Sequence, residues 1–184
     1  HLAAVGLTFL FIVGLRRSLR ETEEFNDIKE PNLKKYLDVV ALGTICDVVQ
    51  LKSLNRAFVK EGLKIINNTE KAGLKSLCSV AKIENIDVYE LGYILGPRIN
   101  AAGRTGSPEL GFRLLTSKNK DETNAIADKL NQLNQERQNI EKNVLDQSIE
   151  KIENHMIENG LNDYPSSIFV SHDNWHLGVL GIVA

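Results

Sequence analysis

The feature that most constrains this chain is a helical pattern that runs unbroken from Asn119 to about Asn159. Asn119, with Glu122 three residues later, resembles a helix capping box, and neither proline nor glycine occurs before Gly160. Such a helix spans roughly 60 Å at 1.5 Å per residue, which exceeds the width of a small domain. Its apolar stripe consists of Ile126, Leu130, Leu133, Ile140, Val144, Ile149, Ile152 and Met156. A coiled-coil arm is one interpretation, but the broad spacing and mixed charges favour a helix that bridges two domains.

Shorter helical patterns fill the chain before this helix. Of the 184 residues, 42% are hydrophobic, which is enough for a substantial core. The spacing of apolar residues predicts helices over residues 2–15, 33–49, 54–66, 73–83 and 87–95, and another that starts at Ser107-Pro108. Ser167 to Ser171 is the one clear strand pattern.

The apolar segment from Leu2 to Leu15 is expected to be a core helix, because a helix that is apolar on all sides is usually buried. It is shorter than the ~20 residues that a membrane span requires. Its basic residues, Arg16 and Arg17, follow the apolar run, which is the wrong order for a signal peptide. We therefore expect no membrane association.

Charge and cysteine content narrow the class of protein. The net charge of −2 argues against a wholly basic nucleic-acid binder, although a local basic patch is compatible with it. Cys46 and Cys78 lie in apolar surroundings without metal-site spacing, which indicates reduced core thiols in a cytoplasmic protein. The chain starts at His1 and stops at Ala184 within an apolar, glycine-rich run, so we expect a piece of a longer protein.

A candidate phosphate site lies between Gly96 and Arg104. Arg98 and Arg104 flank a run of small residues, and Pro97 is expected to stop the preceding apolar helix. Small side chains and Gly103 would let a ligand approach backbone amides that are free to donate, while arginine matches the geometry of phosphate. The alternative is a helix-packing corner in which both arginines pair with carboxylates.

Asp47 is the candidate metal ligand. It is a single acid with apolar neighbours on both sides, and a buried carboxylate requires a partner. A metal ion is one possible partner, and an N-cap or an ion pair is the alternative. His172 and His176 have the spacing of a helical metal pair, but a turn intervenes and no carboxylate completes the set, so we do not expect zinc there.

Four segments, in order, resemble the RecJ-type single-strand-specific exonucleases of the DHH phosphoesterase superfamily. They are Tyr36–Val49, Leu95–Arg104, Leu133–Gln138 and Asp173–Ala184. The second segment, Leu-Gly-Pro-Arg-Ile-Asn-Ala-Ala-Gly-Arg, is the most specific of the four. The sequence departs from the family pattern at Gln50 and Leu177, where proline is usual, and the upstream aspartate motifs and the Asp-His-His signature are absent.

The resemblance implies an α/β protein with the DHH phosphoesterase fold, of which this chain is a mostly helical part. Residues 1–116 would be the C-terminal part of the catalytic domain, 117–160 the connector helix, and 161–184 the start of an α/β DHHA1 domain. Asp47 would be one carboxylate ligand of a two-metal Mn²⁺ or Mg²⁺ centre. The residues implied to contact single-stranded DNA are Arg98, Asn100, Gly103, Arg104, His176, Gly178 and Gly181.

The implied activity is 5′–3′ exonucleolytic hydrolysis of single-stranded DNA in repair and recombination. The whole enzyme would carry this activity, and this chain, as a part of it, would be inactive alone. One alternative is a DHH-type phosphodiesterase for short oligonucleotides or cyclic dinucleotides, although the long connector argues against it. Another is a non-catalytic helical DNA-binding module.

Overall fold

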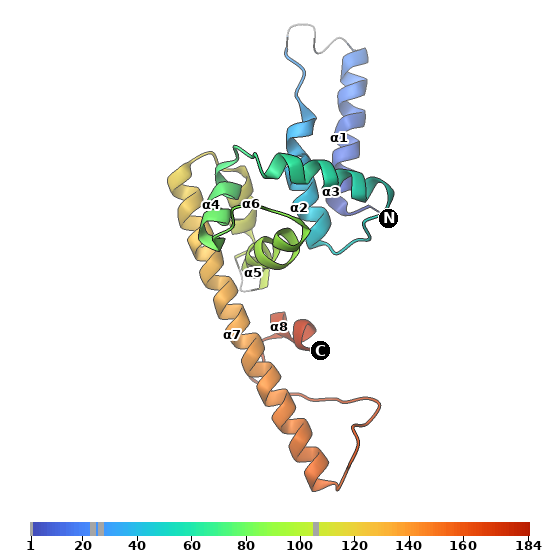
Figure 1. Ribbon diagram of the computed structural model, residues 1–184, viewed down its shortest axis with the longest axis vertical. Coiled ribbons are helices and arrows are strands. Elements are labelled where there is room, and N and C mark those ends of the chain that lie inside the picture. Colours follow the sequence, from blue (N-terminus) through green and yellow to red (C-terminus); the bar gives the residue numbers. More distant parts are fainter. Residues whose placement is uncertain (1, 23–24, 26–27, 105–106) are drawn as a thin grey trace.

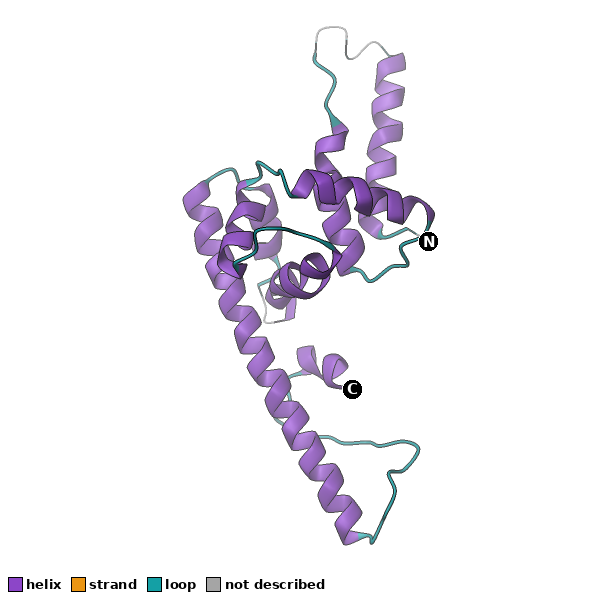
Figure 2. Ribbon diagram, viewed as in Figure 1, coloured by secondary structure: helices purple, strands orange, loops and turns teal. Residues whose placement is uncertain are grey.

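The computed structural model describes residues 2–22, 25, 28–104 and 107–184. Within this part of the chain, only helices and loops are present (Figure 2). In chain order the helical segments are α1 (Ala4–Glu21), η1 (Leu33–Tyr36), α2 (Leu37–Cys46), α3 (Ser53–Ile66), α4 (Ala72–Ala81), η2 (Glu90–Leu95), α5 (Gly96–Arg104), α6 (Glu109–Thr116), α7 (Lys120–Glu158) and α8 (Leu177–Val183).

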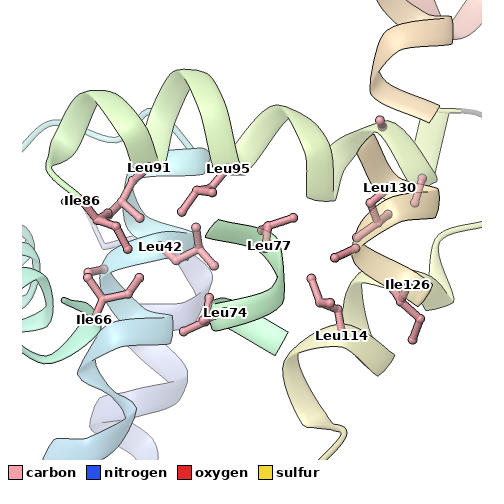
Figure 3. Packing of buried hydrophobic residues seen from close by; sticks show 14 of the residues in the cluster. Leu42, Ile66, Leu74, Leu77, Ile86, Leu91, Leu95, Leu114, Ile126 and Leu130 are labelled. Atoms are coloured by element: carbon pink, nitrogen blue, oxygen red, sulfur yellow. The ribbon is translucent and has the colours of Figure 1, made fainter. Parts of the chain in front are cut away.

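The hydrophobic core lies where α2 to α6 meet the first half of α7 (Figure 3). Most of these segments contribute buried leucine or isoleucine side chains, and α5 contributes Ala101 and Ala102. The large residues include Leu42, Ile66, Leu74, Leu77, Leu91, Leu95, Leu114, Ile126 and Leu130. The helices α2 and α3 pack very closely at Gly62, where a Cβ atom would lie 2.2 Å from the carbonyl oxygen of Leu37. This close packing fixes α2, and with it the position of Asp47.

The long helix α7 confirms the pattern predicted from Asn119 onward. It has 39 residues, and the Asn119 side chain accepts hydrogen bonds from the backbone N–H groups of Asp121 and Glu122. The capping box is incomplete, because the Glu122 carboxylate accepts from Ser117 and Arg113 instead of returning to the Asn119 backbone. The second half of α7 extends away from the helical body. The chain then returns, and α8 lies beside the middle of α7 (Figure 1).

The burial expected for the first helix is only half correct. One side of α1 packs on the body, where Phe9 meets Phe58 edge to face at 5.5 Å and a Cβ at Gly6 would lie 3.6 Å from the same Phe58 ring. The opposite side is exposed, with 64% of Leu7 and 69% of Phe11 accessible. The sequence showed that α1 is apolar on all sides, but no second described element covers its outer side.

The expected stop at Pro97 is wrong. Helical structure continues from Val88 to Arg104, with a π-helical stretch, η2, directly before α5. Proline lacks the N–H group and its ring displaces the carbonyl one turn earlier, and a wide π turn accommodates both effects. Since residues 96–104 form an α-helix, their amides are mostly engaged within the helix, and the expectation that these amides are free to donate is also wrong.

The predicted strand at Ser167–Ser171 is not formed, so the start of an α/β domain is not seen among the described residues. These five residues are exposed and have no regular secondary structure. A strand requires backbone pairing with a neighbour, and no other described segment is in a strand conformation that could pair with it. Within the described residues, no helix combines the length and apolar character that crossing a membrane requires.

Candidate functional site

Asp47 lies at the C-terminal end of α2 and is exposed to solvent. Its backbone N–H closes the last turn of the helix by donating to Gly43 at 3.0 Å. Its carboxylate has no hydrogen bond or ion pair with any described residue. The expected burial of Asp47 is therefore wrong, and neither an N-cap nor an ion pair explains it. An exposed carboxylate without a protein partner remains available to a cation.

The residue after Asp47 has an unusual backbone conformation. Val48 has φ of 53° in the left-handed region, and 89% of its side chain is exposed. β-Branched residues rarely adopt this conformation, because the Cβ substituents crowd the backbone. Strained residues of this kind are found more often at functional sites than elsewhere. The left-handed conformation of Val48 sets the direction of the backbone directly after Asp47.

Asp47 and Asn100 line the same open pocket, which has a volume of about 330 Å³. Three elements converge there, namely the start of α1, the last turn of α2 and the middle of α5. The lining residues are Ala3, Ala4, Val5, Gly43, Cys46, Asp47 and Asn100. The structure thus brings together two of the residues predicted from separate motifs.

Cys46 supports this pocket by packing. Its sulfur lies 3.8 Å from the carbonyl oxygen of Leu91, and a Cβ at Gly96 would come within 2.6 Å of the same sulfur. Burial, together with the adjacent Asp47 charge, raises the pKa of the Cys46 thiol to about 11. The thiol is therefore protonated at neutral pH and serves as a close contact between α2 and α5, as expected for a core thiol.

The two arginines of α5 point to different neighbours. Arg98 is half-buried, and its Nε donates to the Asn131 side chain of α7 at 3.0 Å. One of its terminal nitrogens donates to the carbonyl oxygen of Ile94 at 2.7 Å. Partial burial lowers the pKa of the Arg98 guanidinium from its ordinary value. Arg98 therefore links α5, which contributes Asn100 to the pocket, to the long helix α7.

Arg104 joins α5 to α8 instead. A terminal nitrogen of its exposed guanidinium donates to the carbonyl oxygen of Gly178 at 2.8 Å. The Gly178 N–H donates to Nδ1 of His176 at 3.1 Å, and a Cβ at Gly178 would lie 2.9 Å from the Arg104 carbonyl oxygen. Hence Arg104, His176 and Gly178 form one cluster. In the described part of the chain, neither Arg104 nor Arg98 pairs with a carboxylate, so the packing-corner alternative is wrong in that detail.

Asn100 and Arg104 relate the Asp47 pocket to the cluster of Arg104, His176 and Gly178. They are four residues apart on α5, so they lie on the same face of the helix. Gly103 and Gly181 are exposed and have no neighbour within 4 Å of an added Cβ. The predicted residues therefore form a band that runs from the Asp47 pocket along α5 to α8, with Arg98 on another side of α5.

The described residues do not assemble a metal centre by themselves, since no three of their His, Cys, Asp or Glu side chains are grouped to hold an ion. Asp47 fits as one oxygen ligand, and Mn²⁺ or Mg²⁺ requires several. His172 lies in the loop before α8 with its ring stacked on Trp175 at 6.0 Å, whereas His176 caps α8.

Three residues with important contacts were not singled out from the sequence. Asp38 is fully buried and binds Lys71, and its position within the first resemblance segment, before an apolar run, could have marked it. Asn131 holds Arg98, and Gln147 accepts a hydrogen bond from Trp175. Both are polar residues on a long polar helix, so no local pattern distinguishes them.

Comparison with known proteins confirms the resemblance seen in the sequence. No protein-family model matches the chain. Over its whole length it is 37% identical to the single-stranded-DNA-specific exonuclease RecJ of Escherichia coli and 35% identical to that of Bacillus subtilis. The chain spans 32% of the first relative and 21% of the second, so it corresponds to a third of their length or less.

Solved structures give the same result for the fold. RecJ from Thermus thermophilus in complex with Mg²⁺ matches with a TM-score of 0.73 and 33% identity, over 88% of this chain and 24% of that one. Exonuclease RecJ bound to manganese matches with a TM-score of 0.71 and 33% identity, over 88% of this chain and 39% of that one.

Proposed function

We infer that this chain, which is RecJ-like from end to end, belongs to a metal-dependent exonuclease that hydrolyses single-stranded DNA from the 5′ end. The observation that carries this conclusion is the match of the entire chain to proteins named as single-stranded-DNA-specific exonucleases. The solved relatives are complexes with Mg²⁺ or Mn²⁺, which supports these ions as cofactors. The functions that follow from such an enzyme are DNA repair and recombination.

Asp47 is the proposed ligand that this chain contributes to the metal centre. Its support is an exposed carboxylate without a protein partner, held at the end of a buried helix and facing a pocket with Asn100. Two bound divalent ions would activate a water molecule and stabilise the leaving oxygen of a phosphodiester. The remaining ligands would come from parts of the protein outside this chain.

The proposed path of the DNA strand follows α5 to α8. Asn100, Gly103 and Arg104 would contact phosphates beside the metal pocket, and His176, Gly178 and Gly181 would continue the surface on α8. Arg104 has the strongest support, because it is exposed and four of its five N–H groups are not used by Gly178.

Arg98 would contribute through the N–H groups that Asn131 and Ile94 leave unused. Because Arg98 is half-buried between α5 and α7, it would contact the DNA strand and also hold α5 against α7. Arg98 and Arg104 would both supply the permanent charge that phosphate recognition requires.

The proposed division into domains follows the resemblance to RecJ-type exonucleases. The proposed catalytic domain is 1–116, and its core, which extends from Ala41 to Leu114, also packs against the first part of α7. Residues 117–160 form the connector, and 161–184 would begin an α/β DHHA1 domain whose strand at 167–171 forms when a neighbouring strand is present. We also propose a cytoplasmic location, supported by two cysteines that are free thiols.

The test uses a full-length protein that carries this chain. The protein is incubated with Mn²⁺ or Mg²⁺ and single-stranded oligonucleotides labelled at either end, with double-stranded and dinucleotide substrates in parallel. We expect chelator-sensitive release of nucleotides from the 5′ end of single strands only. A preference for dinucleotides would establish the small-substrate phosphodiesterase instead, and DNA binding without cleavage would establish the non-catalytic module.

A further inference from the structure

Trp175 is the only tryptophan among the 184 residues, and it lies directly before α8. We propose that Gln147 and Lys151 of α7 hold Trp175 and thereby position α8 against α5, so that these three residues position the DNA-binding surface. We call them the indole clasp. This inference rests on the proposed function, because the consequence we derive concerns single-stranded DNA.

The clasp is defined by direct contacts. The indole N–H of Trp175 donates to the side-chain oxygen of Gln147 at 2.7 Å. The ammonium group of Lys151 lies 5.7 Å from the centre of the indole ring, within the range of a cation–π contact. The same ammonium donates to the carbonyl oxygen of Ser171 at 2.6 Å. Gln147 and Lys151 are four residues apart on α7, so both face the returning loop.

The loop that leads to α8 is only weakly held by its own side chains. Every residue from 157 to 174 is exposed, and even Ile168 and Val170, which lie against α7, are 42% and 37% exposed. Trp175 is half-buried against α7 and is the first residue after position 156 that is not exposed. In Figure 1 the chain leaves the far end of α7, swings outward and comes back beside the middle of that helix.

After Trp175, the remaining anchors of α8 are the burial of Val179 and the hydrogen bond from Arg104 to Gly178. The second of these uses an arginine that is itself proposed to bind phosphate. The clasp and the burial of Val179 are therefore the anchors of α8 that lie outside the proposed DNA surface, and only the clasp holds the residue at which the loop enters α8. Its loss would let His176 and Gly178 move relative to α5 without touching the Asp47 pocket.

This arrangement predicts a separation of two kinetic quantities. Gln147→Leu keeps the approximate size of the side chain but removes the acceptor for the indole N–H. Affinity for single-stranded DNA should fall about fivefold, the factor that corresponds to one net hydrogen bond, and KM should rise with it. The value of kcat should stay within about twofold, because the metal pocket lies on other elements.

Conservative and matched variants separate positioning from a loss of folding. Gln147→Glu retains an oxygen acceptor and should restore affinity. Asn143→Leu makes the same kind of exchange at an exposed position of α7 without a partner among the described residues, and it should leave affinity unchanged. Acrylamide quenching of Trp175 in the 184-residue chain reports the clasp directly, and it should increase for Gln147→Leu alone.

The experiment measures binding by anisotropy of a labelled single strand, together with kcat and KM of the full-length protein, for these variants. Weaker binding with unchanged kcat for Gln147→Leu, and recovery for Gln147→Glu, supports the clasp. Unchanged affinity for Gln147→Leu, or an equal loss for Gln147→Glu, overturns it. If the unsubstituted protein binds DNA but does not cleave it with Mn²⁺, the proposed function fails, while the binding data still decide the clasp.

Discussion

At the scale of single residues, the contact between Asp38 and Lys71 shows how α2 is fixed. The Asp38 carboxylate is 1% exposed, and Lys71 donates to both of its oxygens and to the carbonyl oxygen of Lys35. Thr69 donates to the same carboxylate at 3.1 Å. A buried charge with this many partners ties the start of α2 to the start of α4.

Replacing Lys71 by methionine should therefore be strongly destabilising. The substitution keeps the length of the side chain but leaves the buried Asp38 charge without its counterion, which costs about 3–5 kcal/mol of unfolding free energy. Denaturant unfolding measures this value. The double variant Asp38→Asn with Lys71→Met should recover most of the loss, because no buried charge remains, and an equally large loss in the double variant would contradict this account.

The two arginines of α5 give a second prediction at this scale. Each phosphate contact to a single strand contributes about 0.7 to the log–log slope of affinity against salt. Arg104→Ala should flatten this slope by about one contact with little change in thermal stability, since its side chain is exposed. Arg98→Ala should flatten the slope and also lower stability, because its bonds to Asn131 and Ile94 are lost.

Titrating an oligonucleotide at several salt concentrations, with thermal melting as the folding control, measures both effects. Lys129→Ala, at an exposed position of α7, serves as the matched control for removal of a positive charge. If the salt dependence of affinity is unchanged in both arginine variants, Arg98 and Arg104 do not contact phosphate and their role is structural.

At the scale of elements, the start of α7 depends on charge. Hydrogen bonds from the Ser117 hydroxyl and the Arg113 guanidinium lower the pKa of the Glu122 carboxyl. A depressed folded-state pKa contributes stability above the unfolded pKa, and this contribution is lost as pH falls through the folded value. The junction between α6 and α7 is thus more stable at neutral than at acid pH.

The variant Glu122→Gln tests this pH dependence. Its thermal midpoint should lie below that of the unsubstituted chain at about pH 7, and the difference should vanish as the pH falls well below about 4, where the carboxyl is protonated. Melting curves across this range provide the measurement. A difference that persists unchanged at low pH would show that shape, rather than charge, is responsible.

The sequence predicted those elements whose signals are local. Asn119 and the apolar stripe define α7, and the apolar spacing at 33–49 and 54–66 identifies the α2 region and α3 within a few residues. The outer side of α1 and the stretch at 167–171 could not be judged in this way, because burial and strand formation depend on which element lies opposite. Pro97 misled for a related reason, since a π turn that admits proline has no simple sequence signal.

The candidate site was predictable in part. Asp47, Asn100 and Arg104 were identified from motifs, and the structure brings the first two together in one pocket and places the third on the same face of α5. The exposure of Asp47 and the attachment of Arg98 to Asn131 are tertiary facts that no spacing in the chain encodes.

At the scale of the whole molecule, the described part of the chain consists of a helical body and the long helix α7, beside which α8 lies. The isolated 184-residue chain should not hydrolyse single-stranded DNA with Mn²⁺ or Mg²⁺, because one carboxylate cannot hold hard cations that each need several oxygen ligands. The full-length protein under identical conditions is the positive control. Robust chelator-sensitive cleavage by the purified chain would contradict the division of the metal site between this chain and the rest of the protein.

The most direct test of the central claim is the effect of Asp47→Asn on cleavage by the full-length protein. Asparagine keeps the shape of the side chain but removes the charge that attracts a cation, so cleavage should fall by at least about 100-fold while affinity for single-stranded DNA is retained. Asp128→Asn, an exposed acid on α7, should leave cleavage unchanged. If Asp47→Asn cleaves at a rate close to that of the unsubstituted protein, Asp47 is not a metal ligand and the proposed site is wrong.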